Sequence, residues 1–204
     1  MKKLILLAIV ALALPLSAMA SSVTFSTQSG NAWVGSTLST TSSSGFTTPG
    51  RVGTIKGLSG HNYSGLNLGR LTFTTGALAS GSLASGATFA GGGSFTINLN
   101  GSVKGMPNAT VFQGSFSSPV IWTSLGNGYY SLSGTIVGMF NGHKVNGGVT
   151  ILFAGGIKNG HISMSGATVN LPMPVPEPGT LTMLGTGLIG LAGLARRKFK
   201  TTQV

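Results

Sequence analysis

Histidines and hydroxyl groups are the side chains of the central region that could do chemistry. The chain has three histidines, His61, His143 and His161, and no cysteine. A metal site would need these histidines to converge, because residues 21–171 hold no Cys, Asp or Glu to complete a ligand set. A Ser-His-acid triad or a carboxylate pair would need an acid that this region lacks. We therefore expect surface histidines, no metal, no cofactor and no enzymatic activity, with only a Ser-Lys dyad left open.

The charge balance points away from nucleic acid. The formal net charge is +11, and the one acidic residue of the whole chain is Glu177. The basic residues of the central region are widely spaced: Arg51, Lys56, Arg70, Lys104, Lys144 and Lys158. Nucleic-acid binding favours a dense Lys/Arg stripe with interleaved aromatic residues. We expect no nucleic-acid partner and, at most, a weak attraction to anionic polysaccharide or to a cell surface.

The first residues have the pattern of a secretory signal. Lys2 and Lys3 give a positive start, residues 4–14 are apolar, and Ala18 and Ala20 form a small-x-small site for signal peptidase. The sequence predicts a signal peptide over residues 1–20, removed after Ala20. An uncleaved membrane anchor is the alternative, although the apolar stretch is short for a membrane span.

The last thirty or so residues combine a proline-rich linker, an apolar segment and a basic cluster. Prolines in residues 172–178 fix φ and block helix, so this linker should be extended and accessible. Residues 179–195 would span about 26 Å as a helix, close to the thickness of a bilayer core. The basic cluster that begins the tail, residues 196–204, would stay cytoplasmic. This orientation places residues 21–171, the body of the protein, outside the inner membrane. The cluster is Arg196, Arg197 and Lys198.

This three-part tail, with Pro176, Glu177 and Pro178 ahead of the apolar segment, resembles the bacterial PEP-CTERM sorting signal. The resemblance implies that the chain is the substrate of an exosortase, a membrane transpeptidase-like enzyme, and that the three residues are its recognition motif. It also implies an association with exopolysaccharide and biofilm. Similar tails are also catalogued as an ice-binding protein C-terminal region, which describes the tail and not the body. A plain membrane anchor that is never processed is the alternative.

The body, residues 21–171, reads as β-structure. Apolar and polar residues alternate over residues 94–100, and the same period of two recurs over 130–140, 145–153 and 161–171. Asn-Gly pairs suit type I′ hairpin turns because both residue types tolerate positive φ. The candidate turns are Asn100-Gly101, Asn127-Gly128, Asn141-Gly142, Asn146-Gly147 and Asn159-Gly160. We predict an all-β antiparallel meander that forms a β-sandwich or a flattened barrel.

The earlier half of the body gives a weaker signal. Residues 23–25 and 70–75 read as strands, and Phe112, Phe116 and Trp122 suggest two more. Residues 21–60 are rich in Ser and Thr, and we expect this stretch to be loose in part.

Together these observations predict an exported, non-enzymatic surface or matrix protein. Its partners would be the secretion machinery with signal peptidase, an exosortase, the inner membrane through residues 179–195, and exopolysaccharide. The body would finish at the cell surface or outside the cell. The alternative is a binding module for polysaccharide or ice, with sugar rings stacking on aromatic side chains. Of these aromatic residues, Trp122 and Tyr130 lie on apolar-patterned strands and fit the core better.

Overall fold

The computed structural model describes residues 22–40, 48–103 and 108–173, which belong to one compact unit, Ser22–Met173. The described residues form strands and turns, and none of them forms a helix of the kind that spans a bilayer. The predicted signal peptide, apolar segment 179–195 and basic tail 196–204 lie outside the described residues.

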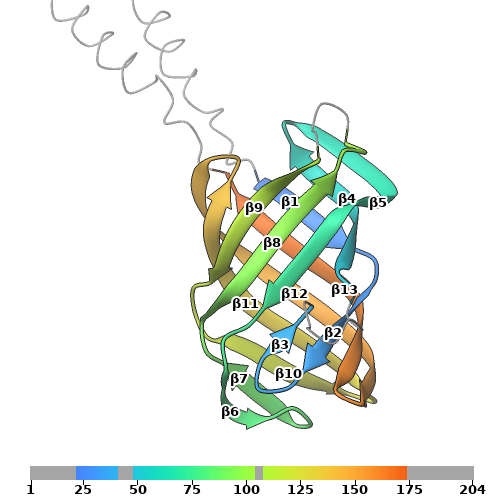
Figure 1. Cartoon of the computed structure of the whole chain (residues 1–204), viewed down its shortest axis with the longest axis vertical. Helices are drawn as coiled ribbons and strands as arrows, with labels where there is room; N and C mark the ends of the chain where they lie inside the picture. The colour runs from blue at the N-terminus through green and yellow to red at the C-terminus, as the bar shows by residue number, and fades with distance from the viewer. Residues whose placement is uncertain (1–21, 41–47, 104–107, 174–204) are drawn as a thin grey trace, which may run out of the picture. The chain divides into compact units, whose positions relative to one another are not determined.

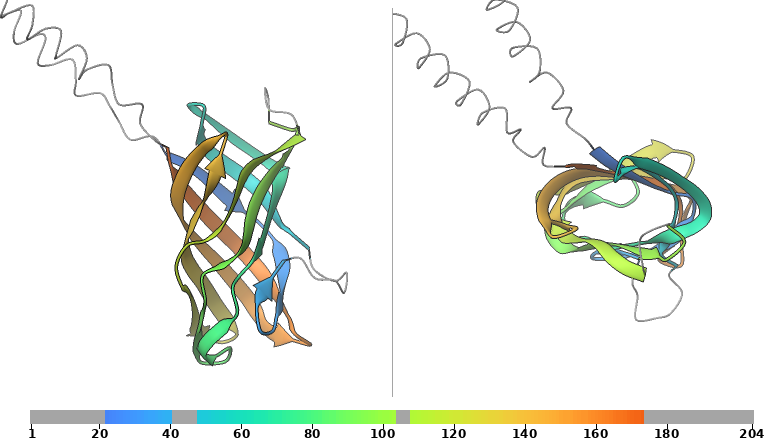
Figure 2. Two further views of the ribbon diagram at one scale, coloured as in Figure 1. Left: turned by 60° about the vertical axis from the view of Figure 1, so that its left-hand side comes forward. Right: turned by 90° about the horizontal axis from the view of Figure 1, so that it is seen from above.

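The all-β prediction is confirmed, with an antiparallel sheet closed into an eight-stranded barrel (Figure 1). The strands are β1 (Ser22–Thr27), β2 (Gly30–Val34), β3 (Leu38–Ser39), β4 (Gly50–Leu58), β5 (His61–Thr74), β6 (Leu78–Ser82), β7 (Gly86–Phe89), β8 (Gly92–Asn100), β9 (Asn108–Phe116), β10 (Val120–Gly126), β11 (Tyr129–Phe140), β12 (His143–Lys158) and β13 (His161–Pro172). Seen from above, the wall is a closed oval (Figure 2), so the flattened barrel, and not the sandwich, is correct.

The barrel is a meander in which neighbours in sequence are neighbours in space. β1 pairs with β4, and the ring continues through β5, β8, β9, β11 and β12 to β13, which pairs with β1 again. Every one of these pairs is antiparallel. Closure gives each wall strand a partner on both sides, so the ring itself has no open edge.

Several wall positions hold two consecutive strands separated by a break of a few residues. β1 and β2 both pair with β13, so they are two parts of one interrupted strand. β9 and β10 are related in the same way along β11, and β8 and β7 run beside them. β3 and β6 lie at the same end of the barrel. The Leu78 N–H, at the start of β6, donates there to the Ser36 carbonyl, just before β3, at 2.7 Å. The breaks let long strands bend as the wall curves.

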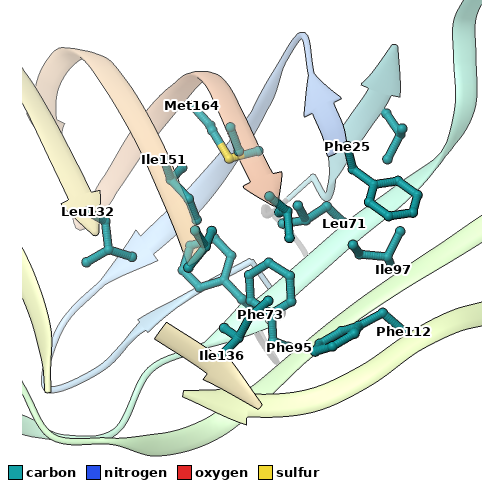
Figure 3. Close-up of a cluster of buried hydrophobic side chains, with 14 of the residues drawn as sticks. Phe25, Leu71, Phe73, Phe95, Ile97, Phe112, Leu132, Ile136, Ile151 and Met164 are labelled. Carbon is teal, nitrogen blue, oxygen red and sulfur yellow. The ribbon is translucent and has the colours of Figure 1, made fainter. Parts of the chain in front are cut away.

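Aromatic side chains fill the interior. Figure 3 shows Phe73, Phe95 and Phe112, which come from β5, β8 and β9 and meet inside the barrel. The Phe95 ring centroid lies 6.3 Å from that of Phe73, 6.0 Å from that of Phe112 and 5.7 Å from that of Phe116. Alternate residues of each strand supply this core, as the period-two pattern predicts. On β12, for example, Val145, Val149, Ile151 and Phe153 are buried.

Three of the Asn-Gly pairs form the predicted hairpin turns. Asn127, Asn141 and Asn159 have φ of 52°, 47° and 51°, and the glycine after each also has positive φ. Two consecutive residues with positive φ match the twist of an antiparallel hairpin. The connection between β4 and β5 uses Ser59-Gly60 in the same conformation, with φ of 50° and 77°, which the Asn-Gly rule did not find.

Asn146-Gly147 is not a turn, so that candidate is wrong, whereas the period-two strand predicted over residues 145–153 is confirmed. Both residues lie inside β12, where Asn146 is paired with Val137 and Gly147 with Ile136. An added Cβ on Gly147 would meet Leu171 Cδ2 at 2.6 Å, so glycine serves close packing here and not chain reversal. Asn100-Gly101 ends β8, and Gly101 alone has positive φ.

The Ser/Thr-rich stretch 21–60 is more regular than we expected. Its described parts, residues 22–40 and 48–60, contribute β1 to β4 to the wall. Phe25 and Leu38 are fully buried, and the buried Thr40 hydroxyl accepts from the Phe73 N–H at 2.8 Å. Hydroxyl groups that bond to neighbouring strands can replace apolar residues in a wall, which composition alone did not reveal.

Candidate functional site

The two ends of the body leave the barrel side by side. Ser22, the first residue of β1, pairs with Pro172, the last residue of β13. An even number of antiparallel strands returns the chain to the end from which it started, so the pairing follows from the eight-stranded closure. Whatever precedes Ser22 and whatever follows Pro172 therefore begin at the same rim.

The sorting residues lie very close to this rim along the chain. Only Met173, Pro174 and Val175 separate Pro172 from Pro176. A fully extended chain of that length reaches no more than roughly 14 Å.

The sequence-predicted site residues belong to the two ends of the chain. The recognition residues Pro176, Glu177 and Pro178, the basic cluster Arg196, Arg197 and Lys198, and the signal peptidase site at Ala18 and Ala20 all lie outside the described residues.

A comparison with protein-family models decides what the tail is. Residues 174–198 match the PEP-CTERM protein-sorting motif. The chain carries a PEP-CTERM sorting signal. The match covers Pro176, Glu177, Pro178 and the basic cluster, so the resemblance drawn from the sequence is confirmed. No curated protein and no solved structure matches the chain.

The PEP-CTERM signal indicates how the protein is exported and sorted. It marks an exported protein that undergoes exosortase-dependent sorting, with the exosortase as its processing partner. It also implies a transient stage at the membrane on the way to the cell surface.

The histidines of the body are not gathered into one site. His61, His143 and His161 are the first residues of β5, β12 and β13, each directly after a hairpin turn. His61 and His143 lie at the rim that holds Ser22, whereas His161 lies at the opposite end, because β13 runs from His161 to Pro172. Within residues 22–40, 48–103 and 108–173 no group of three potential metal ligands forms.

The aromatic side chains divide between core and surface. Trp122 is buried, so the core prediction is confirmed for it, and it stacks on the half-buried Tyr130 at the edge of the core with the ring centroids 4.7 Å apart. The Trp122 indole N–H donates to the Leu83 carbonyl at 2.9 Å. Among the described residues, Trp33 and Tyr129 are 37% and 53% exposed, so their rings could meet a ligand. Trp33 also lies edge-on to His161, with the ring centroids 4.8 Å apart.

A row of polar side chains on the outer wall escaped the sequence analysis. Arg51 on β4 pairs with Arg70 on β5, Arg70 pairs with Asn98 on β8, and Asn98 pairs with Thr110 on β9. The two arginines are far apart in sequence and looked isolated. Only the strand register, which sets which residues face each other, brings them together.

Proposed function

We propose that the barrel is a non-enzymatic surface or matrix module, released outside the cell by cleavage at or near Pro176-Glu177-Pro178. The observation that carries the proposal is the pairing of Ser22 with Pro172, which closes the barrel on itself between the residues ahead of Ser22 and the sorting signal that follows Met173. A domain that closes on itself can be cut from a membrane anchor without losing any part of its wall. The absence of Asp and Glu from residues 21–171 argues for a non-enzymatic role.

Replacing Pro176, Glu177 and Pro178 with alanine in the native host tests this proposal. The expected result is a body that stays at precursor size in the membrane fraction, while the wild-type protein is released at the smaller mature size. Immunoblots of membrane and medium fractions measure both. Unchanged size and release of the variant would refute cleavage at this motif.

A matched control uses residues beyond the matched motif. Alanine at Thr201, Thr202 and Gln203 changes as many residues in the tail but leaves residues 174–198 intact. This control should be processed and released like the wild type. If it also stayed in the membrane, general damage to the tail would explain the first result.

The second candidate function is polysaccharide binding within an exopolysaccharide matrix or biofilm. The outer wall supports it, because hydroxyl, amide and basic side chains alternate with the buried residues on β5, β8 and β9. Pull-down of the purified body with immobilised neutral and acidic polysaccharides tests it. Retention on at least one of them is expected, and loss of retention on changing exposed Trp33 or Tyr129 to alanine would indicate sugar stacking.

A further inference from the structure

Two arginines face each other on the outer wall without a counter-ion in the body. Arg51 and Arg70 occupy directly paired positions on β4 and β5, and both are exposed. The Cβ atoms of such a pair lie about 4.5–5.5 Å apart, and like charges there oppose folding. Residues 21–171 contain no carboxylate side chain that could neutralise either arginine.

The next residues of the same row extend the set of hydrogen-bond donors. Asn98 faces Arg70 on the other side, and the Thr110 hydroxyl donates to Asn98 Oδ1. That bond places the amide oxygen of Asn98 toward Thr110 and leaves the amide nitrogen, which can only donate, on the other side of the amide group. A guanidinium group also only donates. The row Arg51–Arg70–Asn98 therefore presents donors and positive charge together.

The backbone around Arg51 is held on the side away from Arg70. The Arg51 carbonyl accepts from the Gln28 N–H at 2.9 Å, and the Arg51 N–H donates to the Ser29 carbonyl at 2.8 Å. The Gln28 side chain lies over Gly53, where an added Cβ would meet its Cδ at 2.5 Å. These contacts fix the position from which Arg51 projects, so less freedom is lost when a ligand binds.

We propose that Arg51, Arg70 and Asn98 form an oxyanion-binding site that takes the carboxylate groups of an acidic polysaccharide. Paired guanidinium groups suit planar, bidentate oxyanions. Thr110 and Asn98 continue the row with groups that can bond to sugar hydroxyls. Binding of single-stranded nucleic acid would favour an aromatic platform. The exposed Trp and Tyr side chains of the described residues, Trp33 and Tyr129, lie on β2 and β11 and not on the four strands of this row.

This site deepens the proposed polysaccharide-binding function and rests on it for the choice of ligand. The body, residues 22–173, can be tested alone, because it is a closed barrel with its own core. Its affinity should be measured for polygalacturonate, dextran sulfate, neutral dextran and a single-stranded oligonucleotide. Polygalacturonate should bind more tightly than dextran and the oligonucleotide, and salt should weaken the binding.

The double variant R51Q/R70Q should lose about tenfold or more of its polygalacturonate affinity, since it removes charge-assisted hydrogen bonds. The control K144Q/K158Q removes the same charge from β12, where both lysines are exposed, and should change the affinity by about twofold or less. R51K/R70K keeps the charge but loses the bidentate geometry. Its affinity for polygalacturonate should fall between that of R51Q/R70Q and that of K144Q/K158Q. Melting temperatures of all variants check that the barrel remains folded.

The outcomes separate the site from the proposed function. Equal losses in R51Q/R70Q and K144Q/K158Q would overturn the site, because net charge alone would explain the binding, while polysaccharide binding would stand. Tighter binding of the oligonucleotide than of polygalacturonate would overturn the ligand assignment. Failure of the wild-type body to bind any of the polysaccharides would overturn both the site and the binding function.

Discussion

Ser22 and Pro172 are paired residues on neighbouring antiparallel strands, although they are the first and almost the last described residues of the body. The residues ahead of Ser22 and the segment that carries the sorting signal therefore attach to adjacent points of one rim. The hairpin turns at Asn127-Gly128 and Asn159-Gly160 lie at the opposite end of the barrel.

This adjacency predicts that bulk added ahead of Ser22 slows sorting. A small folded domain inserted between Ala20 and Ser22 would crowd the rim from which the short path to Pro176 departs. The conversion of precursor to mature form, followed by pulse-chase in the native host, should slow severalfold. The same domain inserted between Asn127 and Gly128, at the far end, should leave the rate unchanged. Equal rates for both insertions would show that the rim does not limit access.

The phenylalanine cluster predicts a large stability cost for Phe95→Ala. Phe95 is fully buried and its ring approaches those of Phe73, Phe112 and Phe116. Loss of this ring should lower the free energy of unfolding by about 3–5 kcal/mol, measured by urea denaturation of the body. Thr96→Ala, on the outward face of the same strand, should cost less than about 1 kcal/mol. Similar costs for both would contradict the inside-outside assignment.

The strands with strict alternation were predictable from sequence, and the closure of the barrel was not. β8, β11, β12 and β13 show the period of two clearly, because one face of each is buried against the aromatic core. Closure depends on the pairing of β1 with β13, which joins the two ends of the body. No local pattern encodes a contact between residues so far apart in sequence.

The interrupted strands and the arginine row were missed for a related reason. Near Ser39 and Thr40, hydrogen bonds to β5 replace apolar burial, so the composition looked like that of a loose segment. Arg51 and Arg70 became neighbours only through the register of β4 and β5. The sorting signal needed no tertiary information, because its three parts follow one another along the chain.

Gly142 and Gly148 both have room for a side chain but differ in backbone conformation, so alanine at each tests the cost of positive φ without a steric clash. Gly142, in the turn between β11 and β12, has φ of 83°, and Gly148, inside β12, does not have positive φ. An added Cβ would meet no heavy atom within 4 Å at either position. Gly142→Ala should therefore lower the free energy of unfolding by roughly 1–2 kcal/mol, because of the left-handed backbone alone. Gly148→Ala should be neutral or stabilising, by up to about 1 kcal/mol. Urea denaturation measures both, and an equal cost would contradict the hairpin geometry.

The like-charge pair predicts a stability gain that salt removes. Arg70→Gln relieves the repulsion from Arg51 and should raise the free energy of unfolding by about 0.2–1 kcal/mol at low ionic strength. In about 1 M salt the Debye length falls to roughly 3 Å, so the gain over the wild type should disappear. Lys144→Gln is the matched control, because Lys144 faces the uncharged Met139 across the strands and its removal relieves no paired charge. Its effect should be smaller than that of Arg70→Gln at low salt. A gain in Arg70→Gln that persists unchanged in high salt would show that repulsion between the two guanidinium groups is not its cause.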